Sequence, residues 1–276
     1  MPELPEVEIT RRHLEPVLVG AQIAAATVRR QRMVRRQETF VDFAARLCRR
    51  RVDCLDRHGK FMLARIEGDL TWVTHLGMSG RLQVAEPGEA EAPHTNILID
   101  LVDGPQIRFV DPRTFGFMVV YTPEELDRSS VADLGRDALE DLPRSSELAG
   151  LLDDRSAPIK ALLLDQHLIA GLGNIYSDEV LYRAGISPHR PGGSLSSVEV
   201  VSLRASIRPI LETSLATGGT SLADLAYLLP DGRAGDYLAR LEVYGRVGER
   251  CGKCGTTIKA AVLRGRTTHW CSVCQV

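Results

Sequence analysis

The pattern of apolar and polar positions first predicts a helix at the start of the chain. Pro5, with Glu3 and Glu6 close by, provides the proline and the negative charge that are enriched at helix N-termini. Pro16 and Gly20 then predict its end. The first eighteen residues are therefore expected to be helical.

Between about residues 23 and 121 the pattern changes to short apolar runs and alternations, which are typical of strands. Gly, Pro and Asp separate the runs and predict turns. Since strands follow strands over short connections, this region favours an antiparallel sandwich or barrel over alternating strands and helices. The clearest runs are FMLARI (61–66), LTWVTHL (70–76), NILIDL (96–101) and FMVVY (117–121).

An acidic stretch, residues 122–154, separates this region from a helical one and is a plausible domain boundary. Residues 159–185 predict two helices joined at the GLGN turn, 171–174, and residues 196–216 predict another. Neither an internal repeat nor a low-complexity segment is visible in the sequence.

The composition of the 276 residues is that of a soluble globular protein, since 44% are apolar and 25% are charged. This excludes wholesale disorder, collagen and coiled coil. Neither a membrane span nor a signal-peptide core is evident, so the sequence predicts a cytoplasmic protein, associated with the nucleoid if bacterial, with no membrane partner.

Charge is segregated along the chain although the net charge is only −2. Residues 29–65 carry twelve Lys or Arg against four acids, and residues 233–276 carry eight against three. Residues 122–154, between them, carry ten acids against three Arg. Two basic segments could flank one polyanion, although arginine runs also occur as solvated surface.

The cysteines at the C-terminus predict a structural zinc site. Two C-x2-C pairs, separated by sixteen residues, match the spacing of four-thiolate zinc sites. Metal binding would supply folding energy that this small segment cannot obtain from its own core. Two disulfides are the alternative, whereas Cys48 and Cys54 are expected to be ordinary thiols. The predicted ligands of the single zinc ion are Cys251, Cys254, Cys271 and Cys274.

The N-terminus offers a candidate nucleophile. Removal of Met1 would expose the secondary amine of Pro2, whose pKa of about 8 leaves an appreciable neutral fraction near pH 7. Attack on a carbon that bears a leaving group would yield an iminium ion, an electron sink for elimination. Glu3 and Glu6 stand beside it as proton donors or acceptors. The simpler interpretation is that these acids only cap a helix.

Several other candidate side chains lie at or near predicted turns. Each of them, taken alone, is more simply explained by a structural role than by a functional one. The GLGN turn could grip a phosphate at the start of the second helix, although a helical hairpin needs glycine in any case. Loop-borne Met, Arg and Phe could wedge into a base stack. The candidates are Lys60, His75, Met78, His94, Arg113 and Phe115.

Taken together, these segments resemble the formamidopyrimidine-DNA glycosylase and endonuclease VIII family of base-excision repair enzymes. The resemblance covers essentially the whole chain, in the family's order. It rests on PELPEVE, HGK, HLGMSG, DPRTFG, IKALLLDQ, GLGNIYSDE, VYGR and the sequence from CGKCG to WCSVC.

The resemblance implies an α+β fold for a monomer that binds damaged duplex DNA. An N-terminal antiparallel β-sandwich with flanking helices would be followed by a helix-two-turn-helix domain that ends in a zinc-finger hairpin. Oxidised bases or abasic sites would be the lesions bound. The expected parts are a catalytic domain (1–125), an acidic linker (126–145), a DNA-binding domain (146–240) and the zinc finger (241–276).

It also implies roles for single residues. Pro2 would attack C1′ of the damaged nucleotide, Glu3 would help open the sugar ring, and Glu6 would position or protonate the substrate. Lys60 would join this catalytic group, and β- and δ-elimination would then cut the strand on both sides. The positions implied to contact DNA are Lys60, His75, His94, Lys160, Asn174, Tyr244 and Arg266, together with the wedge residues Met78, Arg113 and Phe115.

The wedge favours the branch of the family that removes oxidised purines. An Arg inserted opposite the lesion could donate hydrogen bonds to the orphaned cytosine. The rivals are an endonuclease VIII-type enzyme for oxidised pyrimidines, a non-catalytic lesion-binding protein on the same scaffold and, more remotely, a zinc-ribbon adaptor. Three features bear on specificity or chemistry: Thr114, where the family usually has Arg, the segment GDYLAR (235–240), and retention of Met1.

Overall fold

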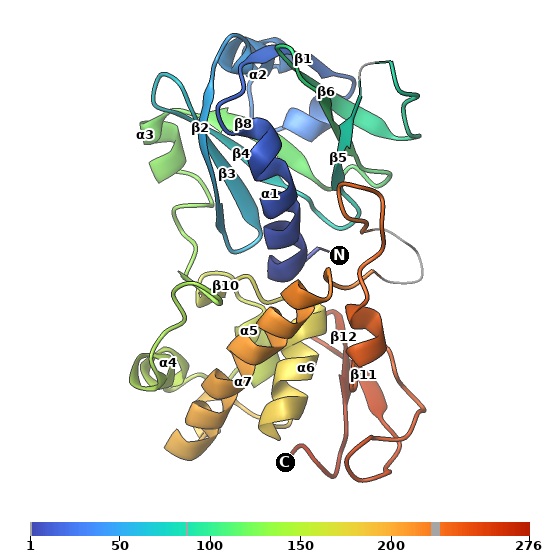
Figure 1. The fold of residues 1–276 in the computed structure, drawn as a ribbon. Helices are drawn as coiled ribbons and strands as arrows, with labels where there is room; N and C mark the ends of the chain where they lie inside the picture. The colour runs from blue at the N-terminus through green and yellow to red at the C-terminus, as the bar shows by residue number, and fades with distance from the viewer. Residues whose placement is uncertain (1, 87, 222–226) are drawn as a thin grey trace. The chain divides into compact units, whose positions relative to one another are not determined.

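The computed structural model shows a chain that forms two compact units (Figure 1). The described residues are 2–86, 88–221 and 227–276. Apart from the residues not described, the first unit comprises Met1–Asp133 and Thr217–Leu238, and the second comprises Leu134–Ala216 and Ala239–Val276. Within the described ranges, no helix has both the length and the apolar character needed to cross a bilayer.

Two four-stranded sheets, antiparallel throughout, form a sandwich in the first unit. Their strand orders are β1-β6-β7-β5 and β2-β3-β4-β8. Apolar side chains from both sheets share one buried core, so the predicted antiparallel sandwich is confirmed. The strands are β1 (Ile23–Val28), β2 (Val52–His58), β3 (Phe61–Ile66), β4 (Leu70–His75), β5 (Arg81–Ala85), β6 (Thr95–Leu101), β7 (Gln106–Val110) and β8 (Phe117–Tyr121).

Helix α1 (Leu4–Leu18) confirms the helix predicted at the start of the chain. Glu3 and Glu6 form a capping box, and Pro5 lies in the first turn, where it deprives the helix of no hydrogen bond. The helix continues through Pro16 at the cost of one backbone hydrogen bond in its last turn, and it ends before Gly20, whose φ is +84°. Its apolar face packs on β2 and the shared core.

The region expected to be all strand contains two helical segments, η1 (Gln31–Val34) and α2 (Phe40–Leu47). The Thr39 hydroxyl caps α2 by accepting the Asp42 N–H at 3.0 Å. Phe43 and Leu47 are fully buried in the core. The buried apolar residues lie four positions apart and, together with the N-terminal cap, favour a helix here despite the surrounding strand pattern. A short helix, α3 (Pro123–Asp127), follows the sandwich.

The second unit is mainly helical. Helix α7 confirms the prediction for residues 196–216, but the two preceding helices are separated by ten residues, 164–173, instead of a tight turn. The Gln166 side chain organises this connection by bonding the carbonyls of Leu164 and Leu172 and the N–H of Gly171. The helices are α4 (Ser145–Leu152), α5 (Ile159–Leu163), α6 (Asn174–Ala184) and α7 (Ser197–Ala216).

Short strands complete the second unit. Strands β9 (Arg136–Asp137) and β10 (Ile169–Ala170) pair in parallel, whereas β11 (Lys259–Leu263) and β12 (Arg266–Trp270) form an antiparallel hairpin. Arg264 and Gly265 both have positive φ at the tip, as a two-residue hairpin turn requires. The remaining 3-10 segments are η2 (Gly192–Ser194) and η3 (Tyr237–Arg240).

Candidate functional site

Two buried carboxylates surround the start of α1. Glu3 is 0% exposed and Glu6 is 1% exposed. The Glu3 N–H donates to Glu6 Oε2 at 2.8 Å, and the Glu3 side chain accepts the N–H of Glu6. The helix N-terminus adds partial positive charge. Both acids are thus held in fixed positions next to the buried Pro2, while Met1 lies outside the described residues.

A segment more than 200 residues away completes the surroundings of Glu6. Its second carboxylate oxygen accepts the Thr220 N–H at 2.8 Å. Gly219 makes this approach possible: its φ is +80°, and a Cβ there would lie 2.9 Å from Glu6 Oε1. Glu6 therefore joins the N-terminus to residues 217–221. This segment is itself anchored by the β-bridge between Thr220 and Asp236.

Lys60 lies in the turn between β2 and β3. A buried ion pair connects the end of β2, just before this turn, to α1. Arg57 Nε lies 3.1 Å from the Glu8 carboxylate, and the two side chains are 2% and 7% exposed. Arg57 also donates to the Gly59 carbonyl at 3.1 Å, one residue before Lys60. Burial alone would raise the pKa of Glu8, but hydrogen bonds from Arg11 and Arg12 and nearby positive charge lower it.

We expect Glu8→Gln to reduce the free energy of unfolding by about 3 kcal/mol, because it removes the negative charge that pairs with the buried Arg57 guanidinium. Urea denaturation would measure the loss. Glu15→Gln is the matched control, since Glu15 pairs with Arg11 from a side chain that is 50% exposed. Its effect should stay below about 1 kcal/mol, and equal effects of the two substitutions would contradict the prediction.

His75 ends β4 as a neutral imidazole. It stacks on Phe117 and packs on Phe61, with ring centroids 5.6 and 4.7 Å away. Burial, reinforced by the charges of Lys60, Arg36 and Arg35, lowers its pKa to about 3. Nδ1 accepts the Gly77 N–H at 3.1 Å, which leaves Nε2–H as the donor. His75 can therefore donate a hydrogen bond to an anion without carrying charge.

The pKa of His75 predicts a pH dependence of stability. Between pH 6.5 and about 3 the unfolded chain binds a proton at His75 that the folded protein does not bind, so the free energy of unfolding falls as the pH is lowered. His75→Gln lacks this contribution. The stability difference between wild type and variant should therefore shrink from pH 7.5 to pH 4.5 in denaturant titrations; a constant difference would count against it.

Met78, Arg113 and Phe115 lie on two loops that one carboxylate joins. Asp111 is fully buried and accepts the Ser79 hydroxyl at 2.6 Å and the Gly116 N–H at 2.7 Å. The loops also touch directly, because a Cβ on Gly77 would lie 2.4 Å from the Gly116 nitrogen. The spacing of the loops is thus fixed by the interior of the sandwich.

The second of these loops presents its side chains at the surface. Phe115 is 39% exposed, and the Arg113 guanidinium lies 4.8 Å from the centre of its ring. Thr114 has a φ of +54°, a strained conformation for a β-branched residue. Its carbonyl accepts Arg32 Nε at 3.1 Å, and Arg35 donates to the next two carbonyls. These arginines hold the loop in the strained form.

His94 is the remaining candidate of the first unit. Its side chain is exposed and its φ is +66°. Its carbonyl accepts the Asp111 N–H at 3.1 Å, and Asn96 donates to the carbonyls of both residues. The main chain of His94 therefore supports the Asp111 loop, while its imidazole is available at the surface.

In the second unit, three candidates converge on the start of β12. Asn174, the first residue of α6, donates to the Thr267 carbonyl at 2.9 Å, and Lys160 on α5 donates to the same oxygen at 3.2 Å. Arg266 precedes Thr267 and is exposed. Lys160 is only 1% exposed and pairs with Asp178 at 2.6 Å, so the structure places its ammonium in the interior.

Tyr244 is held beside the same hairpin. Its ring packs edge-on against His269, with centroids 5.0 Å apart. The buried Glu179 accepts the N–H groups of residues 242, 243 and 244 at 2.9, 3.0 and 2.9 Å. Burial raises the pKa of Glu179, while these hydrogen bonds oppose the shift. One carboxylate of α6 therefore sets the position of the Tyr244 loop.

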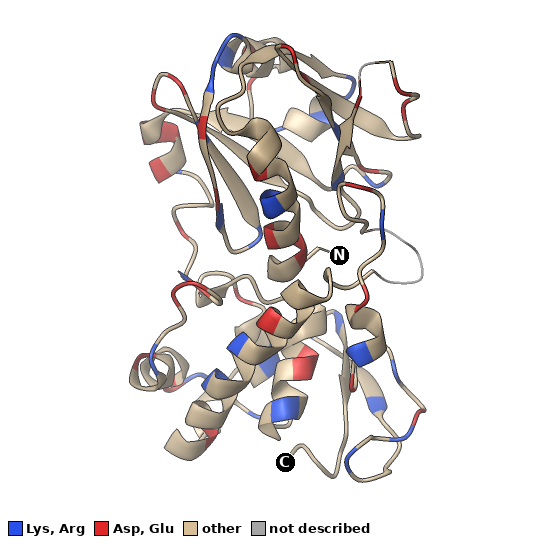
Figure 2. Ribbon diagram, viewed as in Figure 1, with Lys and Arg blue, Asp and Glu red and all other residues tan. Residues whose placement is uncertain are grey.

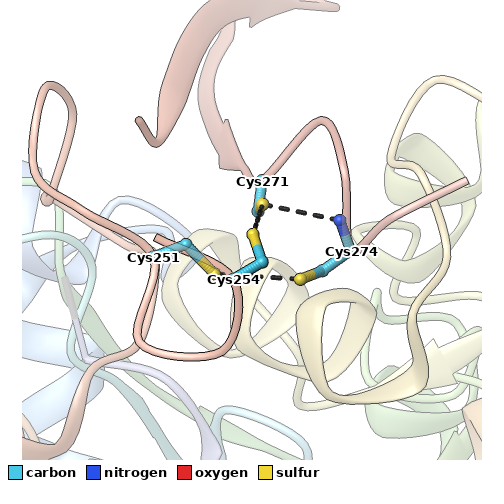
Figure 3. A group of neighbouring side chains, drawn as sticks. All are labelled: Cys251, Cys254, Cys271 and Cys274. Carbon is cyan, nitrogen blue, oxygen red and sulfur yellow. Dashed lines mark hydrogen bonds between the residues drawn. The ribbon is translucent and has the colours of Figure 1, made fainter. Parts of the chain in front are cut away.

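The four C-terminal cysteines gather as the spacing predicts (Figure 3). Their sulfur atoms all lie within 4.8 Å of one another. A zinc ion with Zn–S bonds of about 2.3 Å places tetrahedral sulfurs about 3.8 Å apart. Cys251 and Cys274 are 3.8 Å apart, and Cys254 and Cys271 are 3.4 Å apart, too far for the disulfide length of about 2.05 Å. The donor set fits one structural zinc ion.

Sequence reasoning did not find the residues that hold these candidates. Asp111, Asp178 and Glu179 are buried acids, whereas the prediction considered acids only at the N-terminus. The adjacent pair in NIYSDE offered a signal, because both acids fall on a helix whose neighbouring positions are apolar. Acidic positions also cluster on α3, which belongs to the acidic stretch of residues 122–154 (Figure 2).

Family models cover most of the chain. The formamidopyrimidine-DNA glycosylase N-terminal domain matches residues 1–118, and the formamidopyrimidine-DNA glycosylase H2TH domain matches residues 134–225. The zinc finger found in FPG and IleRS matches residues 248–276. The order of the three agrees with the resemblance identified in the sequence.

Individual relatives match over their full length. The chain is 41% identical over 276 residues to formamidopyrimidine-DNA glycosylase of Geobacillus kaustophilus, covering 100% of both. It resembles the crystal structure of MutM (Fpg) of Thermus thermophilus at 37% identity and a TM-score of 0.89, covering 99% and 98% of the two chains. Lactococcus lactis Fpg in complex with abasic-site DNA matches at 31% identity and a TM-score of 0.90, covering 99% of each chain. A complex of a mutant of that protein contains Fapy-dG DNA, and a complex of the wild type contains DNA with an oxidised pyrimidine.

Proposed function

Because the chain belongs to the formamidopyrimidine-DNA glycosylase family, we propose that it is a bifunctional glycosylase and abasic-site lyase for oxidised purines in duplex DNA. Family membership makes it a DNA glycosylase of base-excision repair. The strand-cleaving chemistry, the preferred lesion and the residue roles are the proposal. The observation that carries it is the pair of buried acids, Glu3 and Glu6, held next to Pro2.

In this mechanism the nucleophile is the secondary amine of Pro2, which forms once Met1 is removed. Its nitrogen bonds to C1′ of the damaged nucleotide as the bond from C1′ to the base breaks, and the departing base takes up the proton that the amine loses. Glu3 donates a proton to the ring oxygen, so the sugar opens and an iminium ion remains on Pro2. Loss of the C2′ proton next to this electron sink expels the 3′ phosphate, and loss of the C4′ proton, conjugated with the iminium through the new double bond, then expels the 5′ phosphate. Hydrolysis of the iminium regenerates the amine.

Glu6 acts in the proposal by fixing this arrangement. Its two oxygens bind the Glu3 N–H and the Thr220 N–H, so it couples the catalytic dipeptide to the segment after α7. Either carboxylate oxygen of Glu6 could also contact the bound nucleotide. Lys60, tied to α1 through Arg57 and Glu8, would supply positive charge near the sugar and its phosphates.

Backbone contacts would compensate for the unstacking of the flipped nucleotide. A neutral His75 donates from Nε2, and Lys60 adds charge from the first unit. Asn174, Tyr244 and Arg266 would hold phosphates from the second unit, and zinc maintains the hairpin that carries Arg266. Zinc is structural in this proposal, since four thiolates leave it no open position for substrate.

The wedge loops support oxidised purines as the lesion. Arg113 can present several N–H donors to an orphaned cytosine, while Met78 and Phe115 fill the emptied stack. The Lactococcus lactis relative, whose complexes include Fapy-dG and abasic-site DNA, agrees with this preference. We expect the enzyme to act where such DNA occurs, on the chromosome, as a monomer.

Borohydride trapping tests the chemistry. With 8-oxoguanine opposite cytosine and an N-terminus verified by mass spectrometry, hydride should reduce the iminium and link enzyme to DNA. Pro2→Gly retains a primary amine and should trap with altered yield, and wild type with Met1 retained should not trap. Absence of a covalent adduct from the processed wild type would leave a lesion-binding protein as the better description.

Oxidised pyrimidines are the second candidate substrate, because a complex of Lactococcus lactis Fpg contains DNA with an oxidised pyrimidine. Duplexes that carry 8-oxoguanine opposite cytosine or thymine glycol opposite adenine separate the two preferences. Faster single-turnover excision of 8-oxoguanine is the expected result. Faster excision of thymine glycol would assign the enzyme an endonuclease VIII-type specificity.

A further inference from the structure

The ammonium group of Lys160 is committed to the interior of the second unit. The side chain is 1% exposed and lies 2.6 Å from the carboxylate of Asp178, which is 0% exposed. It also donates to the Thr267 carbonyl at 3.2 Å. Contact with a phosphate would require it to leave a buried counterion, which is costly because Asp178 would then remain charged in the interior without the ammonium group that balances it.

Asp178 binds β12 as well as Lys160. Its Oδ2 atom accepts the main-chain N–H of His269 at 2.9 Å and lies 3.0 Å from His269 Nδ1. Lys160 reaches the same strand two residues earlier, at Thr267. One buried ion pair therefore holds the main chain of β12 at two successive points on the same edge.

These attachments lie next to an exposed arginine. Arg266 is the first residue of β12 and follows the two-residue turn at the hairpin tip. Asn174 strengthens the attachment by donating to the same Thr267 carbonyl at 2.9 Å. A fixed backbone at residue 267 limits the directions in which the Arg266 side chain can leave the strand, which reduces the entropy lost on binding.

We propose that Lys160 and Asp178 are positioning residues that direct Arg266 to the DNA backbone, and that Lys160 does not itself contact a phosphate. This inference rests on the proposed function, because it assumes that Arg266 binds DNA. It assigns Asp178 a role in DNA affinity and changes the role of Lys160 from a direct contact to an indirect one.

A double-mutant cycle tests the proposal in the full-length, zinc-loaded protein. The probe is a duplex with a tetrahydrofuran abasic analogue, and affinity is measured across a range of salt concentrations. Arg266→Gln is combined with the pair Lys160→Met and Asp178→Asn, which removes both buried charges together. A direct phosphate contact contributes about 0.9 to the slope of log K against log salt.

If Lys160 acts only through Arg266, the paired substitution weakens binding about tenfold in wild type. In the Arg266→Gln background it should change affinity less than twofold and leave the salt slope unchanged. Equal losses in both backgrounds, with a slope smaller by about 0.9 in the Arg266→Gln protein, would show that Lys160 touches a phosphate. No loss in wild type would also overturn the proposal.

Two controls keep the test decisive. Lys160→Gln with Asp178→Asn also removes both charges, keeps an amide oxygen for the His269 N–H, and replaces the first pair of substitutions in the cycle if that pair loses zinc or fails to fold. Arg183→Gln removes an exposed arginine of α6 elsewhere in the second unit and should give additive effects with Arg266→Gln. If wild type does not prefer the abasic duplex to undamaged DNA, the proposed function fails; preference with an additive cycle rejects only this inference.

Discussion

Glu3→Gln should bind a duplex containing 8-oxoguanine with nearly wild-type affinity and excise the base at least about a hundredfold more slowly. The amide keeps the oxygen that accepts the Glu6 N–H, so the start of α1 stays capped. It has no acidic proton for the sugar oxygen, and a positioned general acid contributes about 10² to 10⁴ in rate. Single-turnover excision and equilibrium binding measure the two quantities separately.

A preformed abasic site provides the control for Glu3→Gln. Its ring-opened aldehyde has already lost the base and needs no proton on the ring oxygen, so cleavage at this site should decline far less than excision. A parallel loss of both activities would indicate damage to the Pro2 environment. Wild-type excision by the variant would remove Glu3 from the mechanism.

Removal of zinc should abolish specific DNA binding, with a loss of at least about a hundredfold in affinity. The cluster beneath the hairpin has few buried apolar side chains, among them Val243 and Ile258, so the metal supplies much of its folding energy. The Tyr182 hydroxyl, from α6, lies 3.2 Å from Cys251 Sγ and links the site to the helical core. Loss of the ion would therefore release the hairpin that carries Arg266.

Metal analysis and binding to the tetrahydrofuran duplex, before and after chelation, would measure this effect. Cys254→Ser should reproduce it, whereas Cys48→Ser, which alters a thiol outside the cluster, should keep one zinc per chain and normal affinity. Unchanged affinity in metal-free protein would mean that the hairpin is stable without zinc or dispensable for binding.

Local sequence patterns predicted the parts of this protein that depend on local physics. The capping acids around Pro5 located α1, the alternating runs located the sandwich strands, and the paired C-x2-C motifs located the metal site. Each signal lies within a few residues. Helix α2 was not predicted because the helix is only about two turns long and lies within a strand-rich region.

The supports of the candidate site could not be predicted in the same way. Glu6 meets Thr220, Asp111 meets Ser79, and Lys160 meets Thr267 only after the chain has folded. Hydrophobic periodicity carries no information on such polar pairs, since a buried acid and a solvated acid look alike in sequence. The predicted catalytic and DNA-contacting roles remain predictions for the experiments above.

The bond between Glu6 and Thr220 has a consequence for biosynthesis. Its two residues are 214 positions apart, and Thr217–Leu238 belongs to the same unit as the N-terminus. A nascent chain can therefore assemble the sandwich early but cannot complete the surroundings of Glu6 until α7 and the segment after it have left the ribosome. Contacts of such high sequence separation form late and slowly. Translation itself thus delays the completion of the Glu6 surroundings, and fragments that end before residue 217 should fold in part but lack the bond that holds the second oxygen of Glu6.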